Sequence, residues 1–519
     1  MRRTIRNKYL LMAVCIILSF SIFSGCTNNK PVSNSQDEQV VLKWVLGGLG
    51  ELKDSEMVWG EFNKKLQEFI PNTTVSFEVI PYSDFEEKWR LMAASKEEVD
   101  LVWVGWMLDI AEEAKKGSLM ALDELLADRT DLKEELPDYI FDLTKVDGKP
   151  YAIPNYQIMT SLPYGAKTQA ELAKKHNLDA EAVTKIFDKQ DVITKEDFKV
   201  FEDYLEKLKT AGELQKGVSR SFLYSIIGRI GGLGQFRESI TANAVIDWRD
   251  NDIKVYDLLT DFPEANGYYD LAHDWYQKGY IRKDILSIQD FAADENKENG
   301  YVLWSHSVFE GDSERQTKQA GFPILSIPVC QEMYVPHARP STNTGISKTS
   351  KNPERAMQLL ELMNTEKGKE LYNMLVFGIE GTHYNKISET DIEWLCTEAP
   401  GKSTENTYGF DNWVIGNMFN SYETQYDTQG WNDYILNKVN AGATPSPLIG
   451  FTLNTDNIKL EIAQYSAIMR EYEYVRLGAN SNYKELIAER DSKLKKAGSD
   501  KIIEEVRKQV EEWKSKYKN

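Results

Sequence analysis

Short apolar runs alternate with helical patterns in the part of the chain that follows residue 40. The runs 40–46, 74–80 and 101–104 are rich in Val, Leu, Ile and Trp, which predicts buried strands. Between them, apolar residues recur at helical spacing over 55–69 and 85–94. Alternating strands and helices predict a parallel sheet with helices on its faces, so the expected fold class is α/β.

The stretch 100–126 places an indole directly after a strand. A glycine ends the strand 101–104, Trp106 follows it, and helical spacing begins at Ile110. An α/β sheet presents ligands at this carboxyl edge, and a bare indole there suits the apolar face of a sugar ring. Core packing is the alternative for both Trp103 and Trp106, and it is favoured for Trp103, which lies inside the strand.

The rest of the chain is mostly helical, with a few extended segments. Proline-bounded strips at 147–154 and 323–329 suit crossovers between two lobes. The runs 244–248 and 254–256 predict a hairpin, and 300–309 predicts a strand that ends in aromatic residues. Helices are expected over 169–216 and 262–278, from near Ser350 to about Leu362, and over 483–519, and the charge run of the last is interpreted as a solvated face.

Two loops look superficially like ligand sites. The glycines of 47–50 are not followed by the Lys-Ser/Thr pair of a phosphate loop and lack the dinucleotide spacing. The acidic stretch 188–197 has its oxygen ligands and glycine in the wrong places for a calcium loop. We therefore expect no metal and no cofactor.

The N-terminus has the organisation of an export signal. A basic head of three Arg and one Lys precedes an uncharged apolar run over 9–23, which is short for a membrane span. Phe23-Ser-Gly-Cys26 resembles the lipobox of bacterial lipoproteins. This resemblance implies a signal peptide over 1–25, a lipidated (palmitate-bearing) Cys26, a polar tether over 26–39, and a protein anchored on the outer face of the cell membrane.

Charge and cysteine content exclude several classes of protein. Removal of the four positive charges of residues 1–25 takes the formal net charge from −19 to −23. Such an acidic chain would repel phosphate, so a nucleic-acid partner is not expected. Cys15 leaves with the signal and Cys26 carries lipid, so only Cys330 and Cys396 remain, and whether they pair is left open. The length of 519 residues suggests two or three domains.

Four further stretches carry a family resemblance. They are Ser-Lys-Asn-Pro-Glu-Arg-Ala-Met-Gln-Leu-Leu at 350–360, Gly-Ile-Glu-Gly-Thr-His-Tyr at 378–384, Pro-Leu-Ile-Gly-Phe at 447–451, and the helical ending 494–513. Together they resemble the extracellular solute-binding lipoproteins of bacterial ABC importers, in the carbohydrate branch and its long-chain oligosaccharide subgroup. The resemblance runs from Cys26 to near the end of the chain.

This resemblance implies a two-lobed periplasmic-binding-protein-like fold of type II that closes over its ligand. The implied lobes are 40–153 plus 328–375, and 154–327 plus 376–519 with extra terminal helices. The implied function is capture of an oligosaccharide and its delivery to an ABC transporter permease, by a monomer that is not an enzyme, in a Gram-positive bacterium. The ligand-binding residues that the resemblance implies are Glu51, Trp106, Asn155, Tyr156, Trp304, Phe309, Glu310, Asn417, Asn420, Tyr422 and Trp431. For Trp304 core packing is the alternative, and Asn420 and Tyr422 are equally interpreted as turn residues.

Two other functions stay open at this stage. A surface glycoside hydrolase or lyase would need opposed carboxylates, for which Glu310 and Glu423 are candidates, but no nucleophile elbow, zinc helix or Cys/His constellation is present. A sensor lipoprotein that reports to a membrane kinase would use the same lobes. The loops named above carry few cations, which favours neutral sugars, while Arg339 keeps acidic sugars open.

Overall fold

The apolar runs of the N-terminal third assemble into the centre of one sheet in a computed structural model of the chain. The structure describes residues 38–50, 52–161, 164–189, 192–288, 291–295, 300–309, 311–329, 333–337, 342–395 and 408–517. Within these ranges the sheet has the order β2-β1-β3-β14-β6. Its strands are β1 (Val40–Gly48), β2 (Thr73–Pro81), β3 (Leu101–Gly105), β6 (Ile153–Pro154) and β14 (Thr342–Ile346). The predicted parallel arrangement is confirmed for β1, β2 and β3, and β14 adds to β3 in the antiparallel direction.

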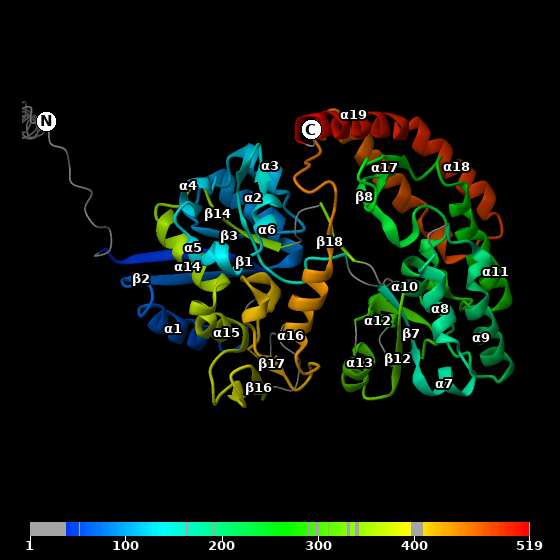
Figure 1. Cartoon of the computed structure of the whole chain (residues 1–519), viewed down its shortest axis with the longest axis horizontal. Coiled ribbons are helices and arrows are strands. Elements are labelled where there is room, and N and C mark those ends of the chain that lie inside the picture. Colours follow the sequence, from blue (N-terminus) through cyan, green and yellow to red (C-terminus); the bar gives the residue numbers. More distant parts are fainter. Residues whose placement is uncertain are drawn as a thin grey trace, which may run out of the picture.

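Helices cover this sheet and complete the first lobe, at the left of Figure 1. The predicted helix after β1 buries Val58, Phe62 and Leu66 on one face. The helix after β3 begins where Asp109 accepts a hydrogen bond from Glu112 N at 2.9 Å and ends at Gly117. The first-lobe helices are α1 (Ser55–Leu66), α2 (Tyr82–Ser95), α3 (Ile110–Lys116), α4 (Asp123–Leu126), α5 (Thr130–Glu135), α6 (Asp138–Asp142), α14 (Pro353–Asn364) and α15 (Lys369–Phe377), and a short hairpin pairs β4 (Lys145–Val146) with β5 (Lys149–Pro150).

The boundary expected at residue 376 is wrong, because the chain beyond it stays in the first lobe. Phe377, Trp394, Tyr408 and Ile415 are buried in the same core as the central sheet. Here β15 (Tyr384–Lys386), β16 (Asp391–Trp394) and β17 (Glu423–Thr424) form a small sheet, and α16 (Trp431–Tyr434) follows. Burial of these large apolar side chains in the first-lobe core fixes the segment there.

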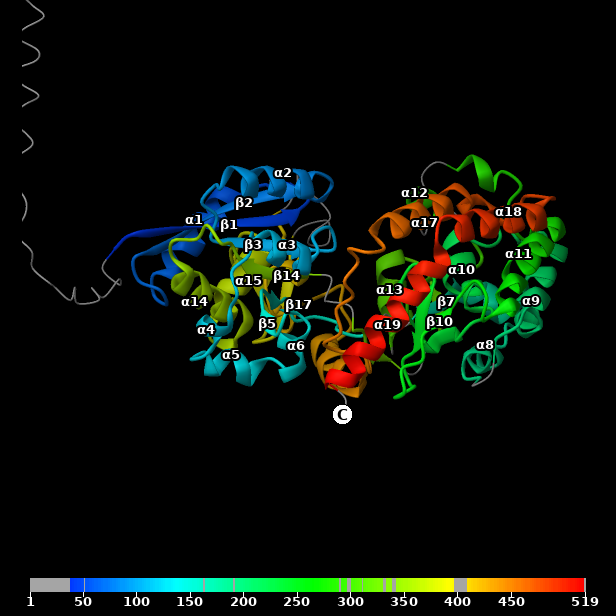
Figure 2. The ribbon, with the colours of Figure 1, turned by 90° about the horizontal axis from the view of Figure 1, so that it is seen from above.

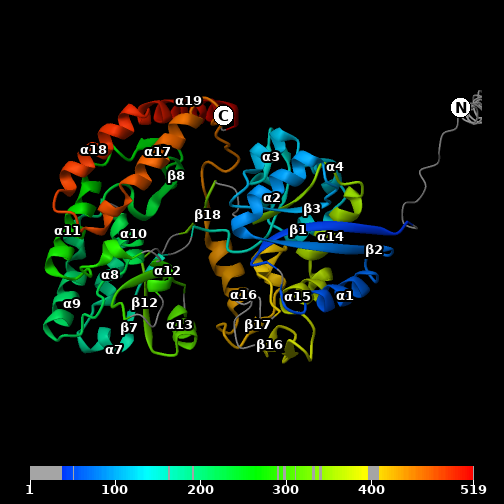
Figure 3. The same ribbon diagram turned by 180° about the vertical axis from the view of Figure 1, so that it is seen from behind.

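The second lobe holds two small sheets surrounded by helices (Figure 3). The sheet β11-β7-β12 and the sheet β10-β9-β8 lie in separate halves of the lobe. The hairpin predicted near 250 is confirmed as β9 and β10, with β8 as a third strand that was not predicted, and the strand predicted at 300–309 is shorter than expected. The elements are β7 (Tyr164–Gln169), β8 (Arg237–Thr241), β9 (Ala244–Asp247), β10 (Tyr256–Asp257), β11 (Trp304–Ser307), β12 (Ile324–Pro328), α7 (Ala170–Lys175), α8 (Ala180–Phe187), α9 (Lys199–Thr210), α10 (Arg220–Ser225), α11 (Gly267–Lys278), α12 (Phe291–Asp294), α13 (Asp312–Ala320), α17 (Lys459–Glu471), α18 (Tyr483–Lys496) and α19 (Ser499–Tyr517).

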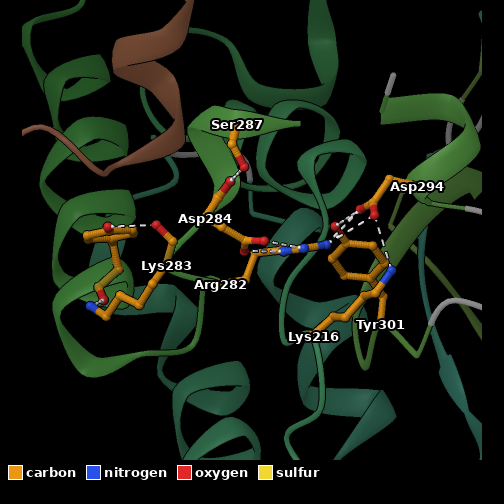
Figure 4. Close-up of polar contacts among 8 residues, drawn as sticks. Lys216, Arg282, Lys283, Asp284, Ser287, Asp294 and Tyr301 are labelled. Atoms are coloured by element: carbon orange, nitrogen blue, oxygen red, sulfur yellow. Dashed lines mark hydrogen bonds and ion pairs between the residues drawn. The ribbon is translucent and has the colours of Figure 1, made fainter. Parts of the chain in front are cut away.

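A cluster of paired charges braces the second lobe around the end of α12 (Figure 4). Asp294 accepts hydrogen bonds from Lys216 Nζ at 3.2 Å, Arg282 NH1 at 3.0 Å and the Tyr301 hydroxyl at 2.5 Å. The other edge of Arg282 donates two hydrogen bonds to Asp284. Since these side chains pair with one another, we interpret the cluster as structural.

In the part of the chain that the structure describes, no helix is both long and apolar enough to cross a membrane.

The chain passes between the lobes three times, as the described elements on either side show (Figure 2). The passages run from β6 to β7, from β12 to β14, and from η10 (Ile435–Asn440) to Leu448, which is buried in a second-lobe core. The strips predicted as crossovers, 147–154 and 323–329, end where the first two passages begin, but they form β5, β6 and β12 of the lobes themselves. The second passage contains β13 (Tyr334–Val335), which pairs in parallel with β18 (Thr444–Pro445) of the third passage. Glu238 of β8 joins both to the second lobe, because its buried carboxylate accepts from His337 N at 2.7 Å and from Ser446 Oγ at 2.5 Å.

Candidate ligand-binding site

Three aromatic rings form a shelf at the carboxyl edge of the first-lobe sheet. Tyr82 begins α2 directly after β2, Trp106 follows β3, and Trp413 lies in the short helix η8 (Asn412–Val414). The Tyr82 ring centroid is 5.0 Å from that of Trp106 and 6.1 Å from that of Trp413, and the latter pair is nearly parallel at 15°. Trp106 is 55% exposed. This aromatic shelf (Tyr82, Trp106 and Trp413) offers the flat apolar surface on which a sugar ring stacks.

The shelf rests on Trp103, whose burial agrees with the core packing favoured for it. The Trp103 ring meets Trp106 edge-on at 5.1 Å and is fully buried. A Cβ at Gly105 would lie 2.0 Å from this ring, and one at Gly47 would lie 2.5 Å from it. These two glycines at the strand ends therefore make room for the indole beneath the shelf.

Hydrogen bonds from three parts of the first lobe hold the shelf in place. The Tyr82 hydroxyl donates to Asp411 Oδ2 at 3.0 Å. Burial raises the pKa of the Asp411 carboxyl, and burial together with the charge of Asp411 raises the pKa of the Tyr82 hydroxyl. Thr342 Oγ1 donates to the carbonyl of Trp413 at 2.9 Å and accepts from Gln157 Nε2 at 2.7 Å. Tyr82 and the backbone of Trp413 are thus held in place before any ligand arrives.

A pocket of about 490 Å³ adjoins the shelf at Trp106 and is lined by both lobes. The first lobe contributes Trp106, the start of α3 and Asn343. The second lobe contributes the tip of β8 and, after the third passage, Phe451, Thr452, Leu453 and Thr455. Asp109 is the one carboxylate, and no Lys or Arg occurs among the described lining residues, which are Gly105, Trp106, Leu108, Asp109, Ile110, Ile240, Thr241, His337, Asn343, Phe451, Thr452, Leu453 and Thr455. Such a site combines apolar walls with a few polar groups, as carbohydrate recognition requires.

The three asparagines expected to contact ligand bond within the first lobe instead. Asn155 Nδ2 donates to the carbonyl of Val414 at 2.6 Å, and its Oδ1 accepts from Thr344 Oγ1. Asn417 Oδ1 accepts from Phe419 N, and Asn420 Nδ2 donates to the carbonyl of Thr365, directly after α14. All three are nearly completely buried. Their amides therefore stabilise the loops beneath the shelf rather than face the pocket in this structure.

The two tyrosines of the expected set also lie away from the interlobe pocket. Tyr156 is buried and meets Phe419 edge-on at 5.0 Å. Tyr422 packs on Phe377 and lines a different hollow of about 470 Å³ on the first lobe, together with Tyr384 and Lys386. Neither tyrosine lines the interlobe pocket, so contact of Tyr156 and Tyr422 with a ligand stays a prediction.

The second-lobe aromatics occupy the region where the lobes approach one another on the side of α13 and α16. Phe309 is buried and meets Trp431 of α16 edge-on at 5.3 Å, while the Arg315 guanidinium lies 4.7 Å from the Trp431 ring. Trp304 is half-buried on β11, opposite Lys167 of β7, whose ammonium forms a buried ion pair with Asp312 at 3.1 Å. Trp106 and Trp304 do not share a described pocket, so a common binding surface for them stays a prediction.

Several expected residues lie outside the described ranges. These are Glu51, Glu310, the lipidation site Cys26, the pair Cys330 and Cys396, and Arg339. In contrast, Tyr82 and Trp413 of the aromatic shelf, and Asp411 that bonds to Tyr82, were not predicted from the sequence. Tyr82 carried a signal, because it follows a predicted strand as Trp106 does.

Comparison with known proteins places this arrangement among transport proteins. Residues 56–370 match the family of bacterial extracellular solute-binding proteins, and residues 447–515 match a domain of unknown function. A carbohydrate ABC transporter substrate-binding protein of Streptococcus pneumoniae serotype 4 is 25% identical over 98% of both chains. The N-glycan transport solute binding protein of Streptococcus pneumoniae has a similar structure, with a TM-score of 0.74, 23% identity and coverage of 92% of this chain and 100% of that chain.

Two further structures share the fold. The same N-glycan transport solute binding protein in complex with Man5GlcNAc has a TM-score of 0.63, with 22% identity over 92% of this chain and 99% of that chain. An extracellular solute-binding protein from Bifidobacterium longum subsp. infantis has a TM-score of 0.58, with 13% identity over 91% of this chain and 98% of that chain. The two-lobed architecture predicted from the sequence is thereby confirmed.

Proposed function

The chain belongs to the family of bacterial extracellular solute-binding proteins, and we propose that it captures an oligosaccharide between its two lobes and delivers it to the permease of an ABC transporter. The observation that carries this proposal is the pocket that both lobes line, next to the aromatic shelf. A ligand that contacts both walls stabilises the closed arrangement of the lobes relative to the open one. The permease can then distinguish the closed, ligand-bound form from the open, empty form.

The pocket supports a neutral oligosaccharide as the ligand. Its described lining carries the Asp109 carboxylate but no cation to pair with an acidic sugar. Stacking on the aromatic shelf and hydrogen bonds to Asp109, Asn343 and the backbone of 451–455 would together recognise both faces of a sugar ring. Since a structurally similar protein is known in complexes with Man1GlcNAc and Man5GlcNAc, mannose-containing N-glycan fragments are the first ligands to test.

Binding can be measured on the mature chain from residue 27. We expect a panel of Man1GlcNAc, Man5GlcNAc, neutral plant oligosaccharides and matched uronate-containing oligosaccharides to include a ligand that raises the melting temperature. At 100 times Kd such a ligand adds about 2.7 kcal/mol to the free energy of unfolding. Calorimetry then gives Kd, which we expect near the micromolar range, or about −8 kcal/mol. Absence of any shift with the whole panel at millimolar concentration would contradict the proposal.

The protein would work while attached to the cell membrane through Cys26. The apolar run 9–23 and the Ser-Gly-Cys sequence that ends at Cys26 support this anchor, and the polar residues 26–39 would act as its tether. Cys26→Ser should abolish incorporation of labelled palmitate and release the protein into the medium. Retention of the label by this variant would exclude Cys26 as the lipidation site.

The family consists of transport binding proteins, and the placement of Glu423 supports a binding function rather than hydrolysis. Both oxygens of this carboxylate are occupied, because they accept from the backbone N–H groups of Gly430 and Asn432, each at 2.8 Å. Chromatography of the bound glycan after long incubation should recover it at its original length. Uptake of that glycan by a deletion strain, measured directly, distinguishes a transport role from signalling to a membrane kinase.

A further inference from the structure

The C-terminal region 447–515 matches a domain to which no function is assigned, and its position between the lobes is informative. After the third passage the chain runs through residues 451–455, which we call the wall segment. Phe451, Thr452, Leu453 and Thr455 of this segment line the interlobe pocket opposite Trp106. The region therefore supplies part of the second-lobe wall of the site.

The wall segment has no secondary structure of its own, so its shape depends on its neighbours. Phe451 is buried between α19 and the second passage, where it meets the Trp513 ring edge-on at 5.9 Å and the His337 ring at 6.2 Å. This contact fixes one end of the segment. The remainder is half-exposed or exposed, and an exposed loop of this kind opens readily in solution.

Gln509 of α19 pairs with the middle of the wall segment as a neighbouring strand would. Its Oε1 accepts from Asn454 N at 2.8 Å, and its Nε2 donates to Asn454 O, also at 2.8 Å. The same Nε2 donates to Glu505 Oε1 at 2.7 Å, one turn earlier on α19, which fixes the orientation of the amide. Both polar groups of the Asn454 backbone are satisfied by one side chain, and residues 453 and 455 on either side turn toward the pocket.

A second contact connects this region with the opposite lobe. Lys459, the first residue of α17, lies 3.4 Å from the Glu112 carboxylate of α3 in the first lobe. The pair is exposed and so contributes little to stability by itself. It nevertheless shows that α17 and α3 meet across the lobes beside the pocket, with the wall segment directly before α17.

We propose that the C-terminal region 447–515 serves to build the second-lobe wall of the ligand pocket, and that Gln509 is the positioning residue that holds the wall segment in its ligand-contacting form. This inference rests on the proposed oligosaccharide-binding function, because it assigns one wall of that site. The Gln509 side chain bonds to Glu505 of its own helix and to the backbone of Asn454. It therefore acts on the ligand only through the wall segment.

The test compares Gln509→Ala with Lys508→Ala, a neighbouring exposed position on α19, in the mature chain. Hydrogen exchange of the 452–455 amides should accelerate about tenfold or more in Gln509→Ala, since two hydrogen bonds to one residue are lost. Calorimetry with Man1GlcNAc and Man5GlcNAc should show a five- to tenfold weaker Kd, about the effect of one net hydrogen bond or slightly more. The melting temperature should not change, and Lys508→Ala should match the wild type throughout.

The outcomes separate this inference from the proposed function. Two results for Gln509→Ala would overturn the positioning role while leaving the function intact. One is hydrogen exchange of the 452–455 amides at the wild-type rate. The other is faster exchange with unchanged affinity for a glycan that the wild type binds. If the wild type binds neither glycan, calorimetry instead uses the panel member that gives the largest thermal shift. If no member binds, the proposed function fails and the inference falls with it.

Discussion

Replacement of Trp106 by Ala is the perturbation whose size the structure sets most directly. The indole is 55% exposed, so of the roughly 200 Å² that a tryptophan side chain can bury, about 110 Å² is open to a ligand. A sugar stacks on one face and covers about half of this area, which at about 25 cal/mol per Å² contributes about 1.4 kcal/mol. We therefore expect Trp106→Ala to weaken oligosaccharide binding about tenfold.

Calorimetry on the mature chain measures this loss, and Leu91→Ala is the matched control. Leu91 is 65% exposed on α2, which also carries Tyr82 at its start, but it does not line the pocket. The free Trp106→Ala protein should lose about 1 kcal/mol of stability, since the indole packs on Trp103 and Tyr82. Titrations must therefore be run well below its melting temperature. An unchanged Kd in a folded Trp106→Ala protein would refute stacking on the shelf.

Three further predictions concern stability. Gly105→Ala should lower the free energy of unfolding, measured in urea, by about 1–3 kcal/mol, because its Cβ would meet the Trp103 ring at 2.0 Å. Gly60→Ala, with open space around its Cβ, should be neutral or stabilising. Equal effects of the two substitutions would contradict close packing of Trp103 on Gly105. Glu238→Ala should cost about 3 kcal/mol, because it strands buried donors of His337 and Ser446, and the exposed neighbour Ser239→Ala should cost almost nothing. Burial raises the pKa of Asp411 above its ordinary 3.8, so its contribution to stability is full below that pH and is lost as the pH rises through the folded-state pKa. Unfolding measured across this range should show Asp411→Asn gaining stability relative to the wild type as the pH rises, and a constant difference would contradict the assignment.

The sequence was most informative where local pattern and burial agree. The strands β1, β2 and β3 and their helices follow from continuous apolar runs and helical spacing, so their order was predictable. The position of Trp106 at a strand end likewise follows from one glycine. The lobe boundary at 376 failed because no local signal distinguishes a loop that returns to the first lobe from one that continues into the second.

The site was less predictable because its members come from distant segments. Trp413 and Asp411 meet Tyr82 across more than three hundred residues, and their loop shows neither helical nor strand periodicity. The buried amides of Asn155 and Asn417 donate to carbonyls of their own lobe, because a polar loop residue satisfies internal carbonyls as readily as ligand hydroxyls. Side-chain direction in such loops is decided by tertiary packing.

An oligosaccharide that binds between the lobes should draw them together. Small-angle X-ray scattering of the mature chain measures this closure, with and without the oligosaccharide that gives the largest thermal shift. We predict that the radius of gyration falls on ligand addition and that the ligand is recovered intact. Saturation of the protein with no change in the radius of gyration would contradict closure of the lobes over the ligand.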